Sequence, residues 1–337
     1  MTCRSPQAFT LVEMLVAVAV SAILLGLVLS ITNQVSATVG TVTGKMDAFQ
    51  SGQAGFDIMT QKLADATLNT YYDYATSSGI PTAYIRKSDL HFYIAQNTNV
   101  AGSPANPNSG HSIYFQAPEG YSNTSTTYAN TPGLLNACGY FVEFGPDNTY
   151  RPTLFSSSSA KNRYRLMQAI QSTENNGIYS DKEGTTAETA PVWINSLNSL
   201  ALPIAENIIA LIIQNPSVYT LTSGSSSPVS PDYQYNSRQG IPPPVSGTNT
   251  ALQSEQMPPV LEITMVAIDG PSAIRLDDGS GNPPAIIENA LKNKFALAAN
   301  YSADLSALES ALAANHIHYQ ILSTSVTLRE SKWSSGQ

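Results

Sequence analysis

The residue types that carry catalytic or metal chemistry are few in this chain, and their spacings are weak signals. His316 and His318 form a His-x-His pair, which a β-strand would point to one face as half of a metal site, but a third ligand is not evident. Residues 277–282, Asp-Asp-Gly-Ser-Gly-Asn, are dense in oxygen atoms, yet they lack the alternating acids and terminal Glu of an EF-hand calcium loop. We interpret the pair as polar residues at a strand start and the acidic stretch as a solvated turn.

Motifs of nucleophilic, phosphate-binding or metal-dependent enzymes do not occur in the sequence. It holds no Gly-x-Ser-x-Gly elbow, no phosphate loop, no His-Glu-x-x-His and no Cys-x-x-Cys. The two cysteines, Cys3 and Cys138, allow at most one disulfide. Cys138 is followed by Gly-Tyr-Phe-Val, which predicts a buried strand with an unreactive thiol. We therefore predict a protein that is not an enzyme, with no catalytic residue, metal ligand or cofactor.

Tyrosines are abundant, and three of them stand close together at Tyr71, Tyr72 and Tyr74. If exposed, such a group would form an adhesive or sugar-stacking surface. If buried, each ring would pack in the core while its hydroxyl reached water. Because the three follow directly on a long helical pattern, we interpret them as packing residues where that helix enters a globular head.

Composition bounds the class of protein. The chain has 337 residues, of which 42% are hydrophobic, so it can form one large domain or two ordinary ones. Only 12% are charged, about half the usual share, which suits an envelope or extracellular protein. The formal net charge is −8, and Lys and Arg are scattered, so the sequence offers no basic surface for nucleic acid.

One segment is apolar enough to cross a membrane. Residues 14–31 carry no charge over a length of about one membrane-spanning helix. Glu13 stands directly before them. A carboxylate at the edge of an apolar span costs roughly 2–3 kcal/mol and usually has a partner. We therefore expect another group to compensate Glu13.

The apolar segment continues into a longer helical pattern without proline. We predict one helix from Phe9 to near Leu68, about 90 Å long at 1.5 Å per residue. Residues 9–31 form its transmembrane half, and residues 32–70 form an amphipathic half that packs on a head made of residues 71–337. The apolar face of the second half comprises Val35, Val39, Val42, Met46, Phe49, Phe56, Met59, Leu63 and Ala66. Glycines such as Gly52 and Gly55 should weaken the helix by about 1 kcal/mol each.

The residues before the apolar segment carry a family resemblance. Ala8–Glu13 read Ala-Phe-Thr-Leu-Val-Glu and follow a short leader with one basic residue, Arg4. In this order they resemble the N-terminus of the type IV pilin superfamily, although Gly is more usual at the position of Ala8. The resemblance implies that prepilin peptidase removes residues 1–8 by cutting between Ala8 and Phe9, and that it methylates the new amino group of Phe9. It also implies that Glu13 pairs with that amino group on a neighbouring subunit during assembly.

Two weaker resemblances concern the rest of the chain. A helix that ends in the Phe56–Leu63 pattern, followed by strands and by residues 257–264, is similar to minor pseudopilin J of type II secretion. Residues 266–276 and 326–333 look more like cassette protein C of the Verru_Chthon pseudopilin-like proteins.

These resemblances imply a structural minor pseudopilin of a type II secretion or type IV pilus-like filament. It would be held by one helix in the bacterial inner membrane, with its head in the periplasm or outside the cell. The implied partners are prepilin peptidase, other pilins or pseudopilins, the inner-membrane assembly platform and membrane lipid.

Other interpretations stay open at this point. A secretory signal peptide has a similar outline, and residues 35–37, Val-Ser-Ala, form a small-residue cleavage site that would release a soluble protein. A plain membrane anchor would leave Glu13 unexplained. For the whole chain, the alternatives are a membrane-anchored or secreted β-rich binding or adhesion protein, for carbohydrate for example, and a major pilin. The length of the chain and its loop-rich head favour a minor or tip component.

After Tyr74 the pattern changes to short aromatic and β-branched runs, which predict an α+β fold with a mostly antiparallel sheet. Helices covering that sheet are predicted at residues 284–300 and 302–315, with Ser302 as an N-cap. Stretches 97–110 and 222–249, rich in Pro, Gly and Ser, are predicted to be mobile surface loops. The predicted strands are Leu90–Ala95, Ser112–Gln116, Cys138–Phe144, Arg163–Gln168, Glu206–Gln214, Leu261–Asp269 and His318–Arg329.

Overall fold

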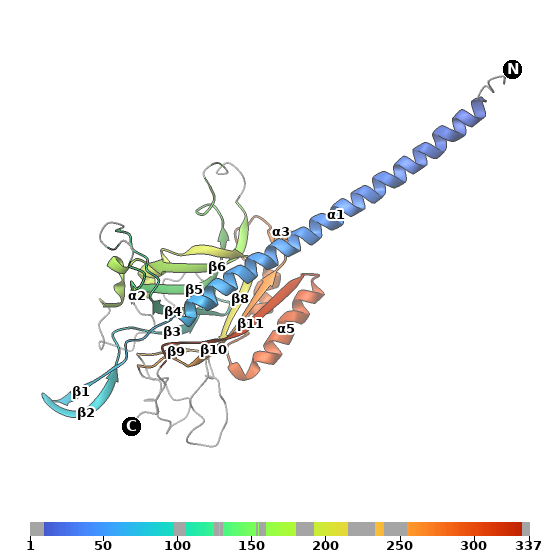
Figure 1. Ribbon diagram of the computed structural model, residues 1–337. Helices are drawn as coiled ribbons and strands as arrows, with labels where there is room; N and C mark the ends of the chain where they lie inside the picture. Colours follow the sequence, from blue (N-terminus) through green and yellow to red (C-terminus); the bar gives the residue numbers. More distant parts are fainter. Residues whose placement is uncertain are drawn as a thin grey trace, which may run out of the picture. The chain divides into compact units, whose positions relative to one another are not determined.

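The computed structural model describes residues 10–97, 106–124, 128, 131–152, 154, 160–179, 192–214, 233–238 and 255–331 (Figure 1). Its fold is α+β, as the sequence predicted: a long apolar N-terminal helix is followed by antiparallel sheets and C-terminal helices. The chain divides into two units, residues 1–47 and residues 48–337. The helix α1, Leu11–Ala64, contributes residues to both.

The first unit contains the N-terminal part of α1, and all of its described side chains are exposed. They include Val35, Val39, Val42 and Met46, which the sequence placed on the face that packs on a head. In the single chain that apolar face is buried only within the second unit, from Phe56 onward. The exposed part is a continuous apolar stripe at helical spacing, which is the surface that a further helix would cover.

The second unit is built on two antiparallel sheets. A six-stranded sheet has the order β7-β6-β5-β4-β3-β9, and a three-stranded sheet has the order β11-β10-β8. All seven predicted strands overlap observed ones. The strands of the six-stranded sheet are β3 (Tyr93–Gln96), β4 (His111–Ala117), β5 (Asn136–Pro146), β6 (Asn162–Gln171), β7 (Leu202–Glu206) and β9 (Tyr235–Asn236). Those of the three-stranded sheet are β8 (Ile208–Gln214), β10 (Val260–Ile268) and β11 (Tyr319–Thr327).

The two sheets are joined where β7 passes into β8. The sequence predicted one strand here, but Asn207 has a φ of +62° and divides it into two. Asparagine tolerates this left-handed conformation better than most residues. The backbone N–H of Asn207 donates to Tyr164 in β6 at 2.7 Å, and its C=O accepts from Ile268 at the end of β10 at 2.9 Å. One residue thus connects an inner strand of each sheet.

Residues 48–64 of α1 pack on the sheets. Phe56 and Leu63 are buried in the core. A Cβ added at Gly55 would lie 2.7 Å from a side-chain carbon of β7, and one added at Gly52 would lie 3.5 Å from side chains of β8 and β10. The glycines that weaken the helix as an isolated element therefore permit its backbone to approach the sheets closely.

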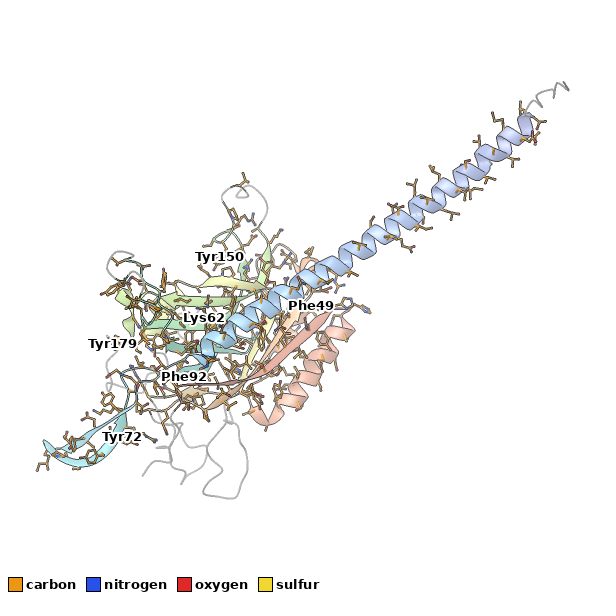
Figure 2. The ribbon with its side chains drawn as sticks, in the orientation of Figure 1. Phe49, Lys62, Tyr72, Phe92, Tyr150 and Tyr179 are labelled. Carbon is orange, nitrogen blue, oxygen red and sulfur yellow. The ribbon has the colours of Figure 1, made fainter. Side chains whose placement is uncertain are left out.

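The first two strands form a separate hairpin, made of β1 (Tyr71–Ser77) and β2 (Ile80–Lys87). The interpretation of the neighbouring tyrosines as packing residues is wrong, because Tyr72 and Tyr74 are 66% and 50% exposed and Tyr72 projects from the hairpin (Figure 2). The physical reason lies at the base of the hairpin. There the side-chain oxygen of Asn69 accepts hydrogen bonds from the backbone of residues 89 and 90, which closes the hairpin on itself.

The C-terminal helices are shorter than predicted. The segment 284–300 holds α4 (Ala285–Leu291) and a 3₁₀ turn (Ala298–Asn300), separated by positive φ angles at Asn293 and Phe295. Helix α5 (Tyr301–Ala314) begins after Asn300, so Ser302 lies inside the helix and is not its N-cap. The hydroxyls of Tyr301 in α5 and Thr264 in β10 are 2.8 Å apart, which ties α5 to the sheet.

Two further helices were not predicted. One is α2 (Val192–Asn198), which carries the buried Trp193. The other is α3 (Gly270–Leu276), whose N-cap Asp269 accepts a hydrogen bond from the backbone N–H of Ser272 at 3.1 Å. The Asp-Gly-Pro-Ser sequence is a recognisable start signal for a helix.

The predicted surface loops are partly core. Of the stretch 222–249 the structure describes residues 233–238, and Tyr233 and Tyr235 there are buried. Tyr235 lies in β9, opposite Ile94 of β3. The remaining residues of that loop lie outside the described residues. Short aromatic segments inside a polar stretch can therefore complete a sheet edge, which composition alone did not reveal.

Candidate functional site

The start of α1 has a defined hydrogen-bonded geometry. Thr10 stands directly before the helix, and its backbone N–H and its hydroxyl each donate to the Glu13 carboxylate at 2.9 Å. In return the Thr10 hydroxyl oxygen accepts from the backbone N–H of Glu13 at 3.3 Å. This reciprocal arrangement is a capping box, in which N-cap and N3 side chains satisfy two helix-terminal donors.

The capping box is a role of this segment that the sequence interpretation missed. The Thr-x-x-Glu spacing within the Phe-Thr-Leu-Val-Glu stretch was its signal. The structure describes Thr10 and Glu13, whereas Ala8 and Phe9 lie outside the described residues. The proposed cut, methylation and intersubunit pairing of Glu13 remain predictions.

The segment that follows is able to span a membrane by its length and composition. It runs over Leu11–Ser36, 26 residues, and none of it is buried within the chain. At 1.5 Å per residue this segment rises about 39 Å, more than the roughly 30 Å hydrocarbon core of a bilayer.

Residues 3–29 match the prokaryotic N-terminal methylation motif. The matched residues include the proposed cleavage position, Glu13 and most of the apolar segment. The motif supports a type IV pilin-like protein that is processed by prepilin peptidase, assembles with other pilins and is anchored by a single membrane-spanning helix. Its family is structural rather than enzymatic. Comparison with curated proteins and with solved structures gave no match.

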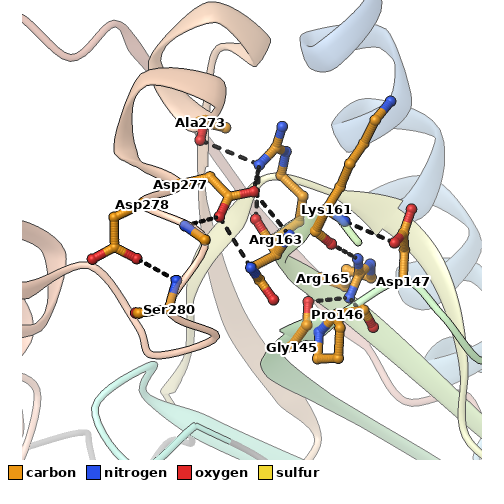
Figure 3. Close-up of polar contacts among 12 residues, drawn as sticks. Gly145, Pro146, Asp147, Lys161, Arg163, Arg165, Ala273, Asp277, Asp278 and Ser280 are labelled. Atoms are coloured by element: carbon orange, nitrogen blue, oxygen red, sulfur yellow. Dashed lines mark hydrogen bonds and ion pairs between the residues drawn. The ribbon is translucent and has the colours of Figure 1, made fainter. Parts of the chain in front are cut away.

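Outside the methylation motif, Asp277 of the acidic stretch forms an ion pair with Arg163 (Figure 3). One carboxylate oxygen accepts from the backbone N–H of Asn162 at 3.0 Å and from Arg163 at 3.2 Å. The other accepts from the Asn162 amide at 3.0 Å and from the backbone N–H of Gly279 at 3.1 Å. Partial burial by itself would raise the pKa of Asp277. These hydrogen bonds and the Arg163 charge have the larger combined effect, so the pKa lies below its usual value.

Asp277 therefore joins α3 to β6 and is not part of a solvated turn. The interpretation holds for Asp278, which is exposed and accepts from the backbone N–H of Ser280 at 2.8 Å. His316 and His318 are both exposed and precede β11 instead of lying on it. Within the described ranges, no group of three or more His, Cys, Asp and Glu side chains could hold a metal ion.

Cys138 is placed as the sequence predicted, in the buried strand β5. Burial raises the pKa of its thiol, and the nearby Glu119 carboxylate acts in the same direction. A thiol that stays protonated is a poor nucleophile and a poor metal ligand.

Proposed function

We propose that the protein is a minor, pseudopilin-like structural subunit of a type II secretion or type IV pilus-like filament. Prepilin peptidase removes residues 1–8 and methylates Phe9, and α1 then holds the subunit in the bacterial inner membrane. The head lies in the periplasm or outside the cell. The subunit acts by assembly with other pilins or pseudopilins on an inner-membrane platform, and it has no catalytic turnover.

The exposed apolar stripe of α1 carries this proposal. From Leu11 to Met46 the helix rises roughly 54 Å, nearly twice the thickness of a bilayer core. Val39, Val42 and Met46 are 57%, 49% and 55% exposed, and they lie beyond the segment that a membrane would cover. Packing of α1 against the same helix of neighbouring subunits would bury them. A plain membrane anchor or a released protein would leave this apolar stripe exposed to water.

The mature chain is expected to begin at N-methylated Phe9. Intact-mass measurement on protein from membranes of a host with prepilin peptidase should show the loss of residues 1–8 and the gain of one methyl group. A host that lacks the peptidase provides the control and should yield the full chain. A start at Thr38 would identify a secretory signal peptide and a start at Met1 a plain anchor, and either result would contradict the proposal.

Glu13 is expected to act in assembly through its charge. Cleavage would place the new amino group of Phe9 four residues from the carboxylate, and adjacent subunits would pair these charges where their helices bundle in low dielectric. An unpaired charge there costs several kcal/mol, so the pair would favour one axial register. Glu13→Gln should therefore reduce incorporation into filaments at least tenfold while membrane insertion and the fold of the head are unchanged.

The capping box supplies a matched control for this variant. Glutamine at position 13 keeps the hydrogen bonds of the box but removes the charge, because Gln also serves at N3. Thr10→Ala removes the hydroxyl partner but keeps the charge. Crosslinking of equally processed subunits to their neighbours should fall for Glu13→Gln and stay high for Thr10→Ala. The opposite pattern would show that Glu13 matters as a helix cap and that the charge-pairing argument is wrong.

A further inference from the structure

A large open groove lies on the head beside the C-terminal end of α1. Its volume is about 730 Å³, within the usual range for small-ligand sites. The part of β6 that forms its floor contributes Gln168 and is only half-buried. The walls come from α1, from the loop after β4, from the loop after β5 and from the turn before β7. Residues that line it include Lys62, Glu119, Tyr121, Tyr150 and Leu200 (Lys62 and Tyr150 are labelled in Figure 2).

One wall of the groove is held by a chain of hydrogen bonds. The Tyr121 hydroxyl donates to the Asn123 side-chain oxygen at 2.8 Å, and the Asn123 amide donates to the Ser172 hydroxyl at 3.0 Å. The amide of Asn175 donates to the same hydroxyl at 3.2 Å. The backbone N–H of Tyr121 donates a hydrogen bond to the Asn136 side-chain oxygen at 3.0 Å. A polar wall with its side chains already in place binds a ligand with little loss of conformational freedom.

The residues around Tyr150 and on β6 are also ordered. The guanidinium of Arg165 lies 5.8 Å from the centre of the Tyr150 ring, which holds that ring by a cation–π contact. The amide nitrogen of Gln168 donates to the Tyr140 hydroxyl. The groove lining thus includes two tyrosines from separate loops, Tyr121 and Tyr150, together with the primary amides of Asn123, Gln168 and Asn175.

Electrostatics narrow the class of ligand. Among the residues that the structure describes, Lys62 and Glu119 are the charged ones that line the groove, and they form an ion pair with each other. The two charges compensate, so the lining is neutral and holds no site for a phosphate, a sulfate or a strongly charged peptide. The lining is also partly apolar, since Ile170, Ala201 and Leu202 belong to it, so a fitting ligand combines an apolar face with groups that can form hydrogen bonds.

We propose that this groove binds a neutral oligosaccharide. A sugar ring has an apolar face that packs on an aromatic ring and a rim of hydroxyl groups that exchange hydrogen bonds with amides. Tyr121 and Tyr150 supply the aromatic surfaces, and Gln168 and Asn175 supply the amides. The inference goes beyond the proposed filament role and does not depend on it, because the groove lies wholly within the second unit. It makes the head a recognition surface as well as a structural one.

Binding is tested on the full chain in a detergent without a sugar headgroup, since a glycosidic detergent would compete for the groove. The probes are the neutral hexasaccharides of maltose, cellulose and chitin, with a hexamer of galacturonic acid as the charged counterpart. Titration calorimetry should show binding of at least one neutral probe with a Kd that changes less than twofold between 50 mM and 500 mM salt.

Three variants localise the binding. Tyr121→Ala is expected to weaken it at least tenfold, and Leu200→Arg, which adds bulk and charge at a side chain that is 47% exposed, should abolish it without touching the core. Tyr179→Ala is the matched control, because that tyrosine is 57% exposed and outside the groove lining, and it should bind like the parent chain. No binding of the three neutral probes, equal binding by Leu200→Arg, or salt-sensitive preference for the acidic hexamer would each overturn the proposal.

Discussion

Lowering the pH from 7 to 5 is expected to destabilise the head by about 4 kcal/mol through two buried histidines. Burial lowers the pKa of His91 from 6.5 to about 3 and the pKa of His111 from 6.5 to about 4. Between those values and 6.5 the unfolded chain takes up protons that the folded chain does not. Stability therefore falls as the pH drops below 6.5, by about 1.4 kcal/mol per pH unit for each histidine.

The hydrogen bonds of the His91 and His111 rings require each imidazole to be neutral. Nδ1 of His111 accepts from the backbone N–H of Ile213 at 3.0 Å, and its Nε2 faces the backbone oxygen of Phe295 at 3.0 Å. Nδ1 of His91 accepts from the indole N–H of Trp193 at 3.2 Å. Since an amide or indole N–H can only donate, both Nδ1 atoms must be unprotonated. A proton added there would point at another donor.

The measurement is urea unfolding of the full chain at pH 7 and pH 5, followed by tryptophan fluorescence. His91→Asn and His111→Asn combined should lose about 4 kcal/mol less than the parent chain over this interval, because Asn keeps an acceptor near Nδ1 but does not titrate. His318→Asn, at an exposed position, is the control and should behave like the parent. Equal pH dependence in the parent and the double variant would contradict the prediction.

Gly110→Ala is expected to prevent stable folding of the head. Gly110 has a φ of +90°, and a Cβ there would lie 2.2 Å from the backbone oxygen of Leu211 in β8. The two residues form an isolated parallel bridge between the residue before β4 and β8, and the adjacent Ser109 carbonyl accepts from the Leu211 N–H at 3.0 Å. Neither backbone can yield without separating the sheets. We expect a loss above about 4 kcal/mol, the range of severe steric defects.

Gly279→Ala separates the steric contact from the backbone conformation. Gly279 has a similar φ of +74°, but nothing lies within 4 Å of an added Cβ. It should therefore show only the left-handed penalty of about 1 kcal/mol. The measurement is the urea midpoint of each variant, which should be much lower for Gly110→Ala than for Gly279→Ala. Similar midpoints would mean that the bridge at Gly110 is not required for a stable head.

The N-terminal helix could be predicted from the sequence because its determinants are local. A helix satisfies its own backbone hydrogen bonds, so an unbroken apolar run after a Thr-x-x-Glu start specifies it without reference to the rest of the chain. Seven predicted strands overlap observed ones for a similar reason, since short aromatic and β-branched runs mark them, but β1, β2 and β9 were not predicted. These runs do not show which strand pairs with which. Tyr235 of β9 pairs with Ile94 of β3 at the edge of the sheet. It lies in a polar stretch far along the chain, where no strand was predicted.

Tertiary structure alone decided which tyrosines are buried and where a ligand could bind. Tyr72 and Tyr235 both occur in tyrosine-rich stretches, yet the first is exposed on an isolated hairpin and the second is buried at a sheet edge. Burial depends on which other elements reach a residue, and no local pattern encodes that. The groove has the same origin, because Lys62, Glu119, Tyr150 and Leu200 come from four separate segments. The sequence itself determined the anchor and its processing motif, whereas only the packing of distant segments could create a binding surface on the head.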